Sequence, residues 1–224
     1  MDWGEKPVRG TFRSELEALK QEIVEVGQMV VSMMDQAILS LARQDLALAR
    51  QVIDRDDEVD RRVIDLEMKA LQMIALRQPM ARDLRTVGTG LKLVTDLERM
   101  ADHAVDIAEI VIRLGDQPLV KPLVDVPRMA ELTREMTEKA LRAYVREDEA
   151  LARAMIEMDH EVDRRFRLVF DELMALMERD PGVVKQATYL LHVAKHLERI
   201  GDHATNLGEW IIYMVTGELQ DLNQ

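Results

Sequence analysis

An internal repeat constrains the fold of this chain more than any other feature. Residues 43–62 align without gaps to residues 146–165, and thirteen of the twenty positions are identical. A second block, residues 97–109, aligns to residues 197–209 at an offset of 100 instead of 103, so the second copy is three residues shorter between the blocks. A chain that carries two such copies is expected to fold as two similar units.

Each copy has the sequence pattern of three long helices. Between Phe12 and Ala42, apolar residues recur at steps of three and four, as on one face of an amphipathic helix. The chain is 47% hydrophobic but only 4% aromatic, with 10 glycines and 6 prolines, which favours helices around an aliphatic core. We therefore predict an all-α fold of two tandem, pseudo-symmetric three-helix bundles with six long helices.

Caps and proline breaks set the expected boundaries. Asp45 is predicted to cap the second helix and Asp125 the fourth, while Pro79 and Pro181 break the chain within each copy. The helices are expected at residues 12–42, 45–78, 81–114, 127–146, 148–179 and 183–216. The first repeat then covers residues 11–115, a proline-containing linker 116–126 and the second repeat 127–217, with residues 1–10 and 218–224 as frayed tails.

Charge and composition exclude several classes of protein. With 42 acidic and 30 basic residues the net charge is −12, which disfavours the phosphate contacts of nucleic-acid binding. The chain has no cysteine, so disulfides, thiolate catalysis and iron–sulfur clusters are excluded. Neither a signal-peptide core nor an apolar stretch of ~20 residues is present, and we expect a cytoplasmic protein without a transmembrane segment.

Four pairs of carboxylates share the spacing i, i+4. They are Asp56 with Asp60, Glu98 with Asp102, Asp159 with Asp163, and Glu198 with Asp202. On a helix each pair lies on one face, where like charges repel by a few tenths of a kcal/mol. Either nearby arginines or a bound hard cation, which accepts oxygens from two adjacent turns, would offset this repulsion. The spacing alone leaves both explanations open.

The proline breaks predict that the pairs of each copy meet. On two antiparallel helices, residues at the same level are separated from the turn by equal numbers of residues. The two carboxylate pairs of the first copy satisfy this condition about Pro79, and those of the second copy satisfy it about the Asp180–Pro181 bond. The four carboxylates of a copy should therefore share one level, roughly 25 to 30 Å from the turn. Since Glu198 and Asp202 lie opposite an apolar stripe, we expect a water-accessible ledge on the flank of each unit.

The histidines next to these carboxylates have a different expected role. His103 and His203 directly follow Asp102 and Asp202, so their side chains point some 100° away. They are expected to contact a ligand of the metal and not the metal itself, or to contact a partner protein. A stripe of histidines on the last helix is not counted as a site, because the first copy has Lys92 and Asp96 at equivalent positions. The sequence contains no Glu-x-x-His di-iron motif, Gly-rich phosphate loop or activated nucleophile, so catalysis has little support.

These motifs together resemble the PhoU family of bacterial phosphate-signalling proteins. The resemblance covers about residues 11–217 and is carried by the doubled unit, Asp-x-x-x-Asp, the stretch RQPMARDLR, and the related stretches LERMADH and LERIGDH. It implies metal clusters on the surface of two three-helix bundles, held by the eight carboxylates above. Asp106 would extend the first set by one turn, and Asn206 replaces it in the second set. The resemblance implies multivalent hard ions, namely iron, or zinc, magnesium, manganese or calcium.

The family resemblance further implies a regulator and not an enzyme. Such a protein would restrain the phosphate-starvation response and modulate high-affinity phosphate uptake, with the transporter's ATPase subunit and the phosphate-sensing histidine kinase as partners. We also expect a homo-oligomer, in the simplest case a dimer, because cations could bridge charged faces of two molecules. Two alternatives stay open at this point: a helical carboxylate-bridged metalloenzyme, either a hydrolase or an oxidase, and a structural protein whose acidic stripes are merely solvated.

Overall fold

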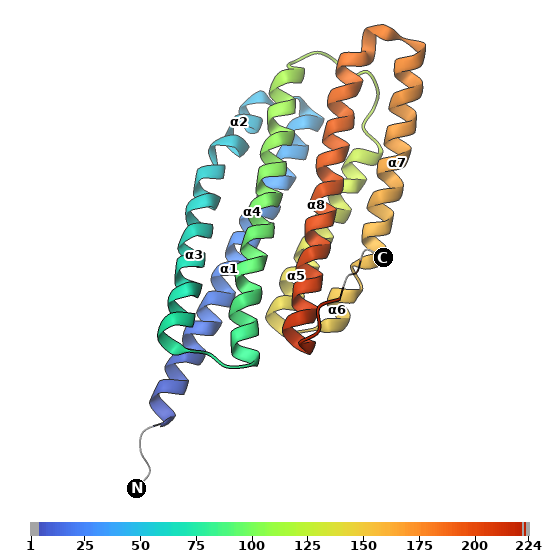
Figure 1. The fold of residues 1–224 in the computed structure, drawn as a ribbon. Coiled ribbons are helices and arrows are strands. Elements are labelled where there is room, and N and C mark those ends of the chain that lie inside the picture. Colours follow the sequence, from blue (N-terminus) through green and yellow to red (C-terminus); the bar gives the residue numbers. More distant parts are fainter. Residues whose placement is uncertain (1–4, 221, 223–224) are drawn as a thin grey trace.

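The computed structural model describes residues 5–220 and residue 222, and helices are its only regular elements in this part of the chain (Figure 1). The first half contains α1 (Glu5–Arg43), α2 (Leu46–Asp54), α3 (Asp56–Arg77) and α4 (Arg82–Leu114). The second half contains α5 (Asp125–Arg146), α6 (Glu149–Arg153), α7 (Ile156–Arg179), a 3₁₀ turn (Pro181–Val183) and α8 (Val184–Thr216). The predicted all-α class and the duplicated architecture are confirmed.

Two of the six predicted helical segments are interrupted. The second segment breaks at Arg55, between α2 and α3, and the fifth breaks between α6 and α7. The prediction of unbroken helices over residues 45–78 and 148–179 missed both interruptions. As a result Asp56 and Asp159 each lie in the first turn of a new helix. The dipole of each new helix favours negative charge at this position.

The repeat extends to the backbone conformation at the start of each interrupted segment. Asp45 caps α2 as predicted, accepting hydrogen bonds from two backbone N–H groups at 3.0 Å, and Asp148 caps α6 by accepting one, from Leu151 N–H at 3.0 Å. The residues before them, Gln44 and Glu147, both have positive φ angles, 52° and 53°. Equivalent residues thus turn the chain at the end of α1 and of α5.

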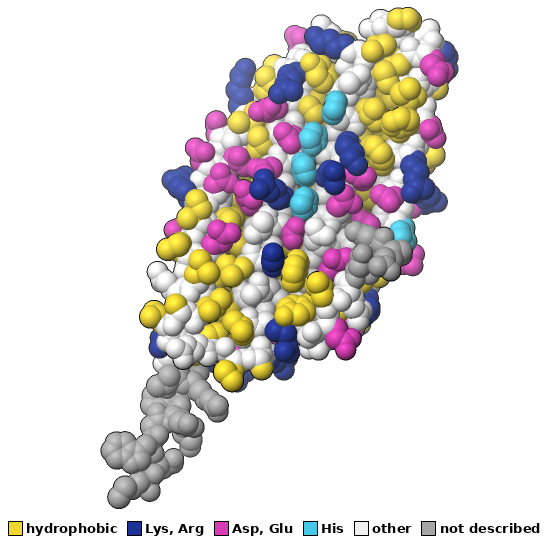
Figure 2. Space-filling model, viewed as in Figure 1, with side chains coloured by type: hydrophobic (Ala, Val, Ile, Leu, Met, Phe, Trp, Pro, Cys, Tyr) yellow, Lys and Arg dark blue, Asp and Glu magenta, His cyan; other side chains and the backbone are white. Residues whose placement is uncertain are grey.

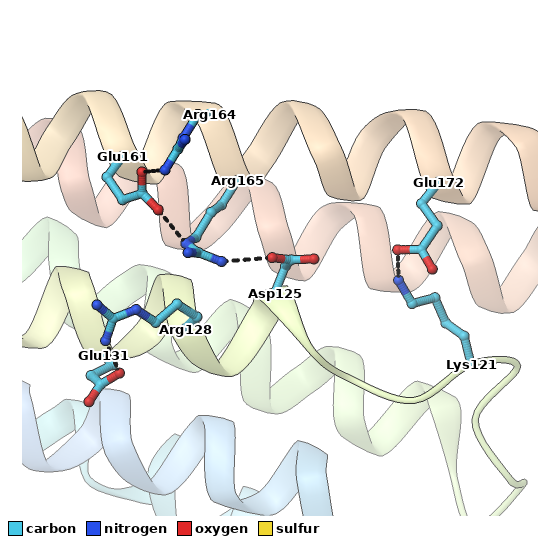
Figure 3. A network of polar contacts seen from close by, with 8 residues as sticks. All are labelled: Lys121, Asp125, Arg128, Glu131, Glu161, Arg164, Arg165 and Glu172. Atoms are coloured by element: carbon cyan, nitrogen blue, oxygen red, sulfur yellow. Dashed lines mark hydrogen bonds and ion pairs between the residues drawn. The ribbon is translucent and has the colours of Figure 1, made fainter.

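The linker between the halves is tied to α7 by ion pairs (Figure 3). Asp125 does not cap α5, contrary to the prediction; it lies in the first turn and accepts a hydrogen bond from Arg165 of α7 at 2.8 Å. The same guanidinium also contacts Glu161 at 2.7 Å. Further along the linker, Lys121 pairs with Glu172 of α7. Arg165 thus pairs with carboxylates of both α5 and α7, and the Asp125 side chain is engaged there instead of capping α5.

The two halves pack against each other through long helices. In Figure 1, α4 lies antiparallel beside α8 at the centre of the molecule, α1 lies beside α5 behind them, and α3 and α7 form the outer flanks. One continuous cluster of buried, mainly aliphatic side chains runs through both halves. Met33 and Met136, which occupy equivalent positions of the repeat, are both completely buried in it.

Both ends of the chain differ from the sequence expectation. Helix α1 begins at Glu5, so residues 5–10 continue the helix instead of forming a tail. Beyond Thr216, where a frayed tail was expected, Gln220 accepts a hydrogen bond from Arg153 at 2.6 Å and Leu222 is buried. No helix in the described part of the chain has the length and apolarity that crossing a membrane requires.

Candidate metal centre

The first acidic ledge consists of Asp56 and Asp60 on α3 and Glu98 and Asp102 on α4. Burial, together with the negative charges of its neighbours, Asp60 and Asp102 foremost, raises the pKa of Asp56 to about 6. The pKa of Glu98 is also raised, by burial and by Asp102 and Asp60, although Arg99 opposes the shift. The fold therefore brings Asp60 and Asp102 close enough to Asp56 and Glu98 to disfavour the ionised forms of these two groups.

Positive side chains offset only part of the negative charge of the first ledge. Arg99 lies 3.1 Å from an oxygen of Asp102 and 3.6 Å from one of Glu98. In contrast, Asp56 Oδ1 is buried and has no hydrogen-bond partner among the described residues. A buried carboxylate oxygen without a donor is costly, and a cation coordinated by several carboxylates would remove this cost. The donor set and the orphaned oxygen suit the hard metal ion that the sequence resemblance implies, but no three of the ledge's carboxylates, all in the described part of the chain, offer ligand atoms within 4.8 Å of one another, so the carboxylates would have to rotate inward to bind it.

The second acidic ledge consists of Asp159 and Asp163 on α7 and Glu198 and Asp202 on α8. Burial raises the pKa of Asp159 to about 6, and the charges of Asp163 and Asp202 add to this effect. Asp159 is only 8% exposed, so this ledge is less open than the sequence pattern suggested. The reason is its close packing on α8, where a Cβ atom at Gly201 would lie 3.4 Å from Asp159 Oδ1.

The second ledge is better compensated by cations than the first. Lys195 forms an ion pair with Glu198, whereas the first copy has Thr95 at the equivalent position. Arg199 faces Asp202 at 3.4 Å, which repeats the contact between Arg99 and Asp102. The first ledge therefore carries more uncompensated negative charge and is the stronger candidate for binding a cation.

Asp106, expected to extend the first ledge, faces a different set of partners. Its Oδ2 lies 3.5 Å from Nδ1 of His103 and 3.4 Å from Nδ1 of His196 on α8, and the two Nδ1 atoms are 3.2 Å apart. Each step of four residues rotates a side chain by ~40° around the helix, so by the second step from Glu98 the carboxylate has turned towards α8. We call His103, Asp106 and His196 the interhelical cluster.

The repeat places a second set of residues opposite this cluster. Asp96, His203 and Asn206 are the equivalents of His196, His103 and Asp106 at the offset of 100. In this set, Asp96 Oδ1 contacts His203 Nδ1 at 2.9 Å and accepts a hydrogen bond from the Asn206 amide at 3.3 Å. Asn206 therefore contacts α4 and is not brought into the second ledge.

The sequence reasoning missed His196 and Asp96 because it compared the copies one helix at a time. The histidine stripe of α8 is not repeated on α4, which has Lys92 and Asp96 at the positions equivalent to His192 and His196. Because α4 and α8 pack antiparallel, a residue of α4 lies beside a residue of α8 that is not its own equivalent in the repeat. His103, for example, lies beside His196, whose equivalent is Asp96. Figure 2 shows the resulting row of histidines along the middle of one face, with acidic side chains on both sides. The shared offset of 100 could have found the pair only if the adjacency of the third and sixth helices had been known, and the sequence did not predict that adjacency.

Burial lowers the pKa of both His103 and His196, although the negative charge of Asp106 opposes the shift in each case. Their imidazoles are therefore neutral at neutral pH. The neutral form of histidine is the one that has a lone pair available for a metal ion or a hydrogen-bond donor.

Comparison with known proteins decides the family. The family model described as "PhoU domain" matches twice, over residues 23–111 and residues 126–211. The chain belongs to the PhoU family. A PhoU homolog from Clostridium acetobutylicum is 38% identical over 96% of this chain and 99% of its own length. Another from Aquifex aeolicus is 40% identical over 92% of this chain and 93% of its own length. Both are named phosphate-specific transport system accessory proteins.

Solved PhoU structures have the same fold. The crystal structure of PhoU from Pseudomonas aeruginosa has a TM-score of 0.89 and 32% identity, and the match covers 92% of this chain and all of that one. A PhoU described as a phosphate transport system regulatory protein, from Streptococcus pneumoniae, gives a TM-score of 0.88 at 30% identity, over 94% of this chain and 99% of that one. PhoU proteins are regulatory accessory proteins and not enzymes, so the metalloenzyme alternative is set aside.

Proposed function

We propose that this protein is a metal-binding helical adaptor that restrains the phosphate-starvation response and modulates high-affinity phosphate uptake through contacts with other proteins. Its relatives are named as accessory and regulatory proteins of the phosphate transport system. In this proposal the acidic ledges hold multivalent cations, and the protein acts in the cytoplasm as a homodimer.

The single observation that supports metal binding best is the state of the first ledge. The carboxylates of Asp60, Glu98 and Asp102 lie close enough to Asp56 to raise its pKa, and Asp56 Oδ1 is buried without a hydrogen-bond partner among the described residues. Among the residues that the structure describes, Arg99 is the one cation paired with the ledge, which therefore keeps a net negative charge. A hard cation would bind the carboxylate oxygens of α3 and α4 and thereby hold these two helices together.

An exposed apolar strip on α3 supports a role as an adaptor. Ile64, Met68 and Leu71 recur at steps of four and three residues and are 58%, 53% and 53% exposed. Two of the equivalent positions on α7 carry charged residues, Arg167 and Asp171. Helix α7 also exposes apolar side chains, Leu168, Phe170 and Met174, but only Met174 occupies a position equivalent to one in the strip. We propose that it contacts one of the partners implied by the family, the ATPase subunit of the transporter or the phosphate-sensing histidine kinase.

A complementation experiment tests this proposal. The gene is deleted, and expression of phosphate-starvation genes is measured at high phosphate with the wild type, the ledge variant Asp56→Asn/Asp102→Asn, or the strip variant Met68→Glu. We expect derepression in the deletion strain, restored repression with the wild type, and weak repression with either variant. Glu58→Gln, which changes an exposed carboxylate of α3 that pairs with Arg62, is the matched control and should repress normally.

The metal itself is tested by elemental analysis of protein purified without chelator. Wild-type protein should retain a multivalent metal, and the double variant Asp102→Asn/Asp202→Asn should retain less. Equal metal contents in the two proteins would reject the ledges as binding sites. Unchanged gene expression in the deletion strain would reject the regulatory role independently of the metal result.

A further inference from the structure

The interhelical cluster joins three metal-ligating side chains from the two central helices of the molecule. His103 and Asp106 come from α4 in the first half, and His196 comes from α8 in the second. Their nearest ligand atoms form a triangle with sides of 3.2, 3.4 and 3.5 Å. All three atoms converge on one point between the helices, although 93 residues separate the two histidines.

The size of this triangle matches a metal coordination shell. In a tetrahedral shell with metal–ligand distances of about 2.0 to 2.2 Å, neighbouring ligand atoms are about 3.3 to 3.6 Å apart. An ion at this distance from all three atoms would lie slightly to one side of their plane. That position leaves one or more coordination sites open for water.

The repeat provides an internal comparison for this geometry. In the equivalent set one imidazole is replaced by Asp96 and the carboxylate of Asp106 by the amide of Asn206. The amide donates a hydrogen bond to Asp96, and the imidazole of His203 contacts the same carboxylate oxygen. Those two contacts join the three side chains through one carboxylate oxygen and use one ring nitrogen. The interhelical cluster instead directs two ring nitrogens and a carboxylate oxygen at one another.

Solvent can reach the interhelical cluster. The side chains of His103 and His196 are 21% and 22% exposed, and that of Asp106 is 47% exposed. The imidazoles are therefore fixed by packing, while an ion can enter from the carboxylate side. Such a combination of restricted ligands and an open side suits a bound ion that keeps a water ligand.

We propose that His103, Asp106 and His196 form a binding site for a divalent first-row transition ion such as Zn²⁺. This site is separate from the acidic ledges, which offer oxygen ligands only, because two imidazoles and one carboxylate favour zinc, cobalt or nickel over magnesium and calcium. A bound ion would connect α4 of the first half to α8 of the second. It would thereby fix the packing of the two halves along the central helix pair.

Titration calorimetry with Zn²⁺ in excess Mg²⁺ tests this site, since Mg²⁺ competes for the oxygen ligands of the ledges. The full-length wild type is compared with His196→Gln and Asp106→Asn. We expect Zn²⁺ affinity to fall at least ~10-fold in both variants, because changes to partners outside the ligand shell already cost 10- to 100-fold. Asp106→Asn reproduces the residue found naturally at position 206, so this variant should fold. Circular dichroism checks the fold of each variant.

Two controls separate this site from the rest of the protein. His192→Gln removes a histidine one turn away on the same helix and should leave Zn²⁺ affinity unchanged. The ledge variant Asp60→Asn/Asp163→Asn should retain the Zn²⁺ site that Mg²⁺ does not block. Co²⁺ bound at the interhelical cluster should show the visible absorption bands of an imidazole-ligated ion, and His196→Gln should abolish these bands. Equal Zn²⁺ affinity and stoichiometry in the wild type and His196→Gln would overturn the inference. Loss of the Co²⁺ bands only in the ledge variant would also overturn it, and either result leaves the proposed function standing.

Discussion

Lys20 on α1 donates a hydrogen bond to Glu147 at the end of α5, with 2.6 Å between Nζ and Oε1, and so ties the first half of the molecule to the second. The lysine is only 4% exposed, and Glu147 also pairs with Arg82 at the start of α4. Three helices from both halves therefore depend on one carboxylate.

We predict that Glu147→Gln lowers the free energy of unfolding by about 2 to 3 kcal/mol, because it leaves the buried ammonium of Lys20 without a charged partner. Urea unfolding followed by circular dichroism measures this change. The matched control is Glu131→Gln, which breaks an exposed pair with Arg128 and should change stability by less than about 1 kcal/mol. Equal effects of the two substitutions would contradict the assigned role of Glu147.

The same ion pair predicts sensitivity to acid. Burial alone would raise the pKa of Glu147, but the hydrogen bonds and charges of Lys20 and Arg82 hold it below the usual 4.5. A carboxyl group with a lowered pKa stabilises the folded state above its ordinary pKa and loses this effect as the pH falls through the lowered value. Below pH 4.5 the stability difference between wild type and Glu147→Gln should therefore shrink, as a series of urea midpoints would show.

The second ledge predicts the opposite pH dependence. The pKa of Asp159 is raised from 3.8 to about 6. Its charge therefore costs nothing below pH 3.8, destabilises the folded protein increasingly between pH 3.8 and about 6, and has a constant effect above. In chelator at pH 7.5, Asp159→Asn should be more stable than the wild type by about 1 to 3 kcal/mol, a difference that is smaller at pH 5. A difference independent of pH would show that packing and not charge is responsible.

Metal removal should destabilise the protein if the first ledge holds a cation. A ligand at 100 times its dissociation constant stabilises a protein by about 2.7 kcal/mol, so chelator should lower the melting temperature and added Mn²⁺ should restore it. Asp56→Asn should abolish most of this response, whereas Glu58→Gln should retain it. Scanning calorimetry with and without chelator provides the measurement. A full Mn²⁺ response in Asp56→Asn would exclude Asp56 from the site.

Gly27 and Gly88 allow the same substitution to be compared in two environments. A Cβ atom at Gly27 on α1 would lie 2.5 Å from Leu141 Cδ2 on α5, whereas nothing lies within 4 Å of one at Gly88 on α4. Overpacking costs about 1 to 3 kcal/mol, while replacing an interior helical glycine by alanine gains up to about 1 kcal/mol. Gly27→Ala should therefore lower the melting temperature and Gly88→Ala should raise it.

Local signals explain why much of the fold was predictable. The side chain of Asp45 acts on backbone groups two and three residues away, and Pro181 interrupts a helix through its own ring, so both features are encoded in neighbouring residues. The break at Arg55 has no glycine or proline signal and was missed. Asp125 was misassigned as a cap because its partner, Arg165, lies 40 residues further along the chain.

The sequence by itself determined the duplication, the helical class and the carboxylate pairs of each ledge, because the three- and four-residue steps of a helix are a local property. Only the tertiary structure decided that Asp159 is buried, that Asp106 faces His196, and that Lys20 meets Glu147. These relationships depend on how two helices rotate and slide when their side chains interlock, and no spacing along one helix contains that information.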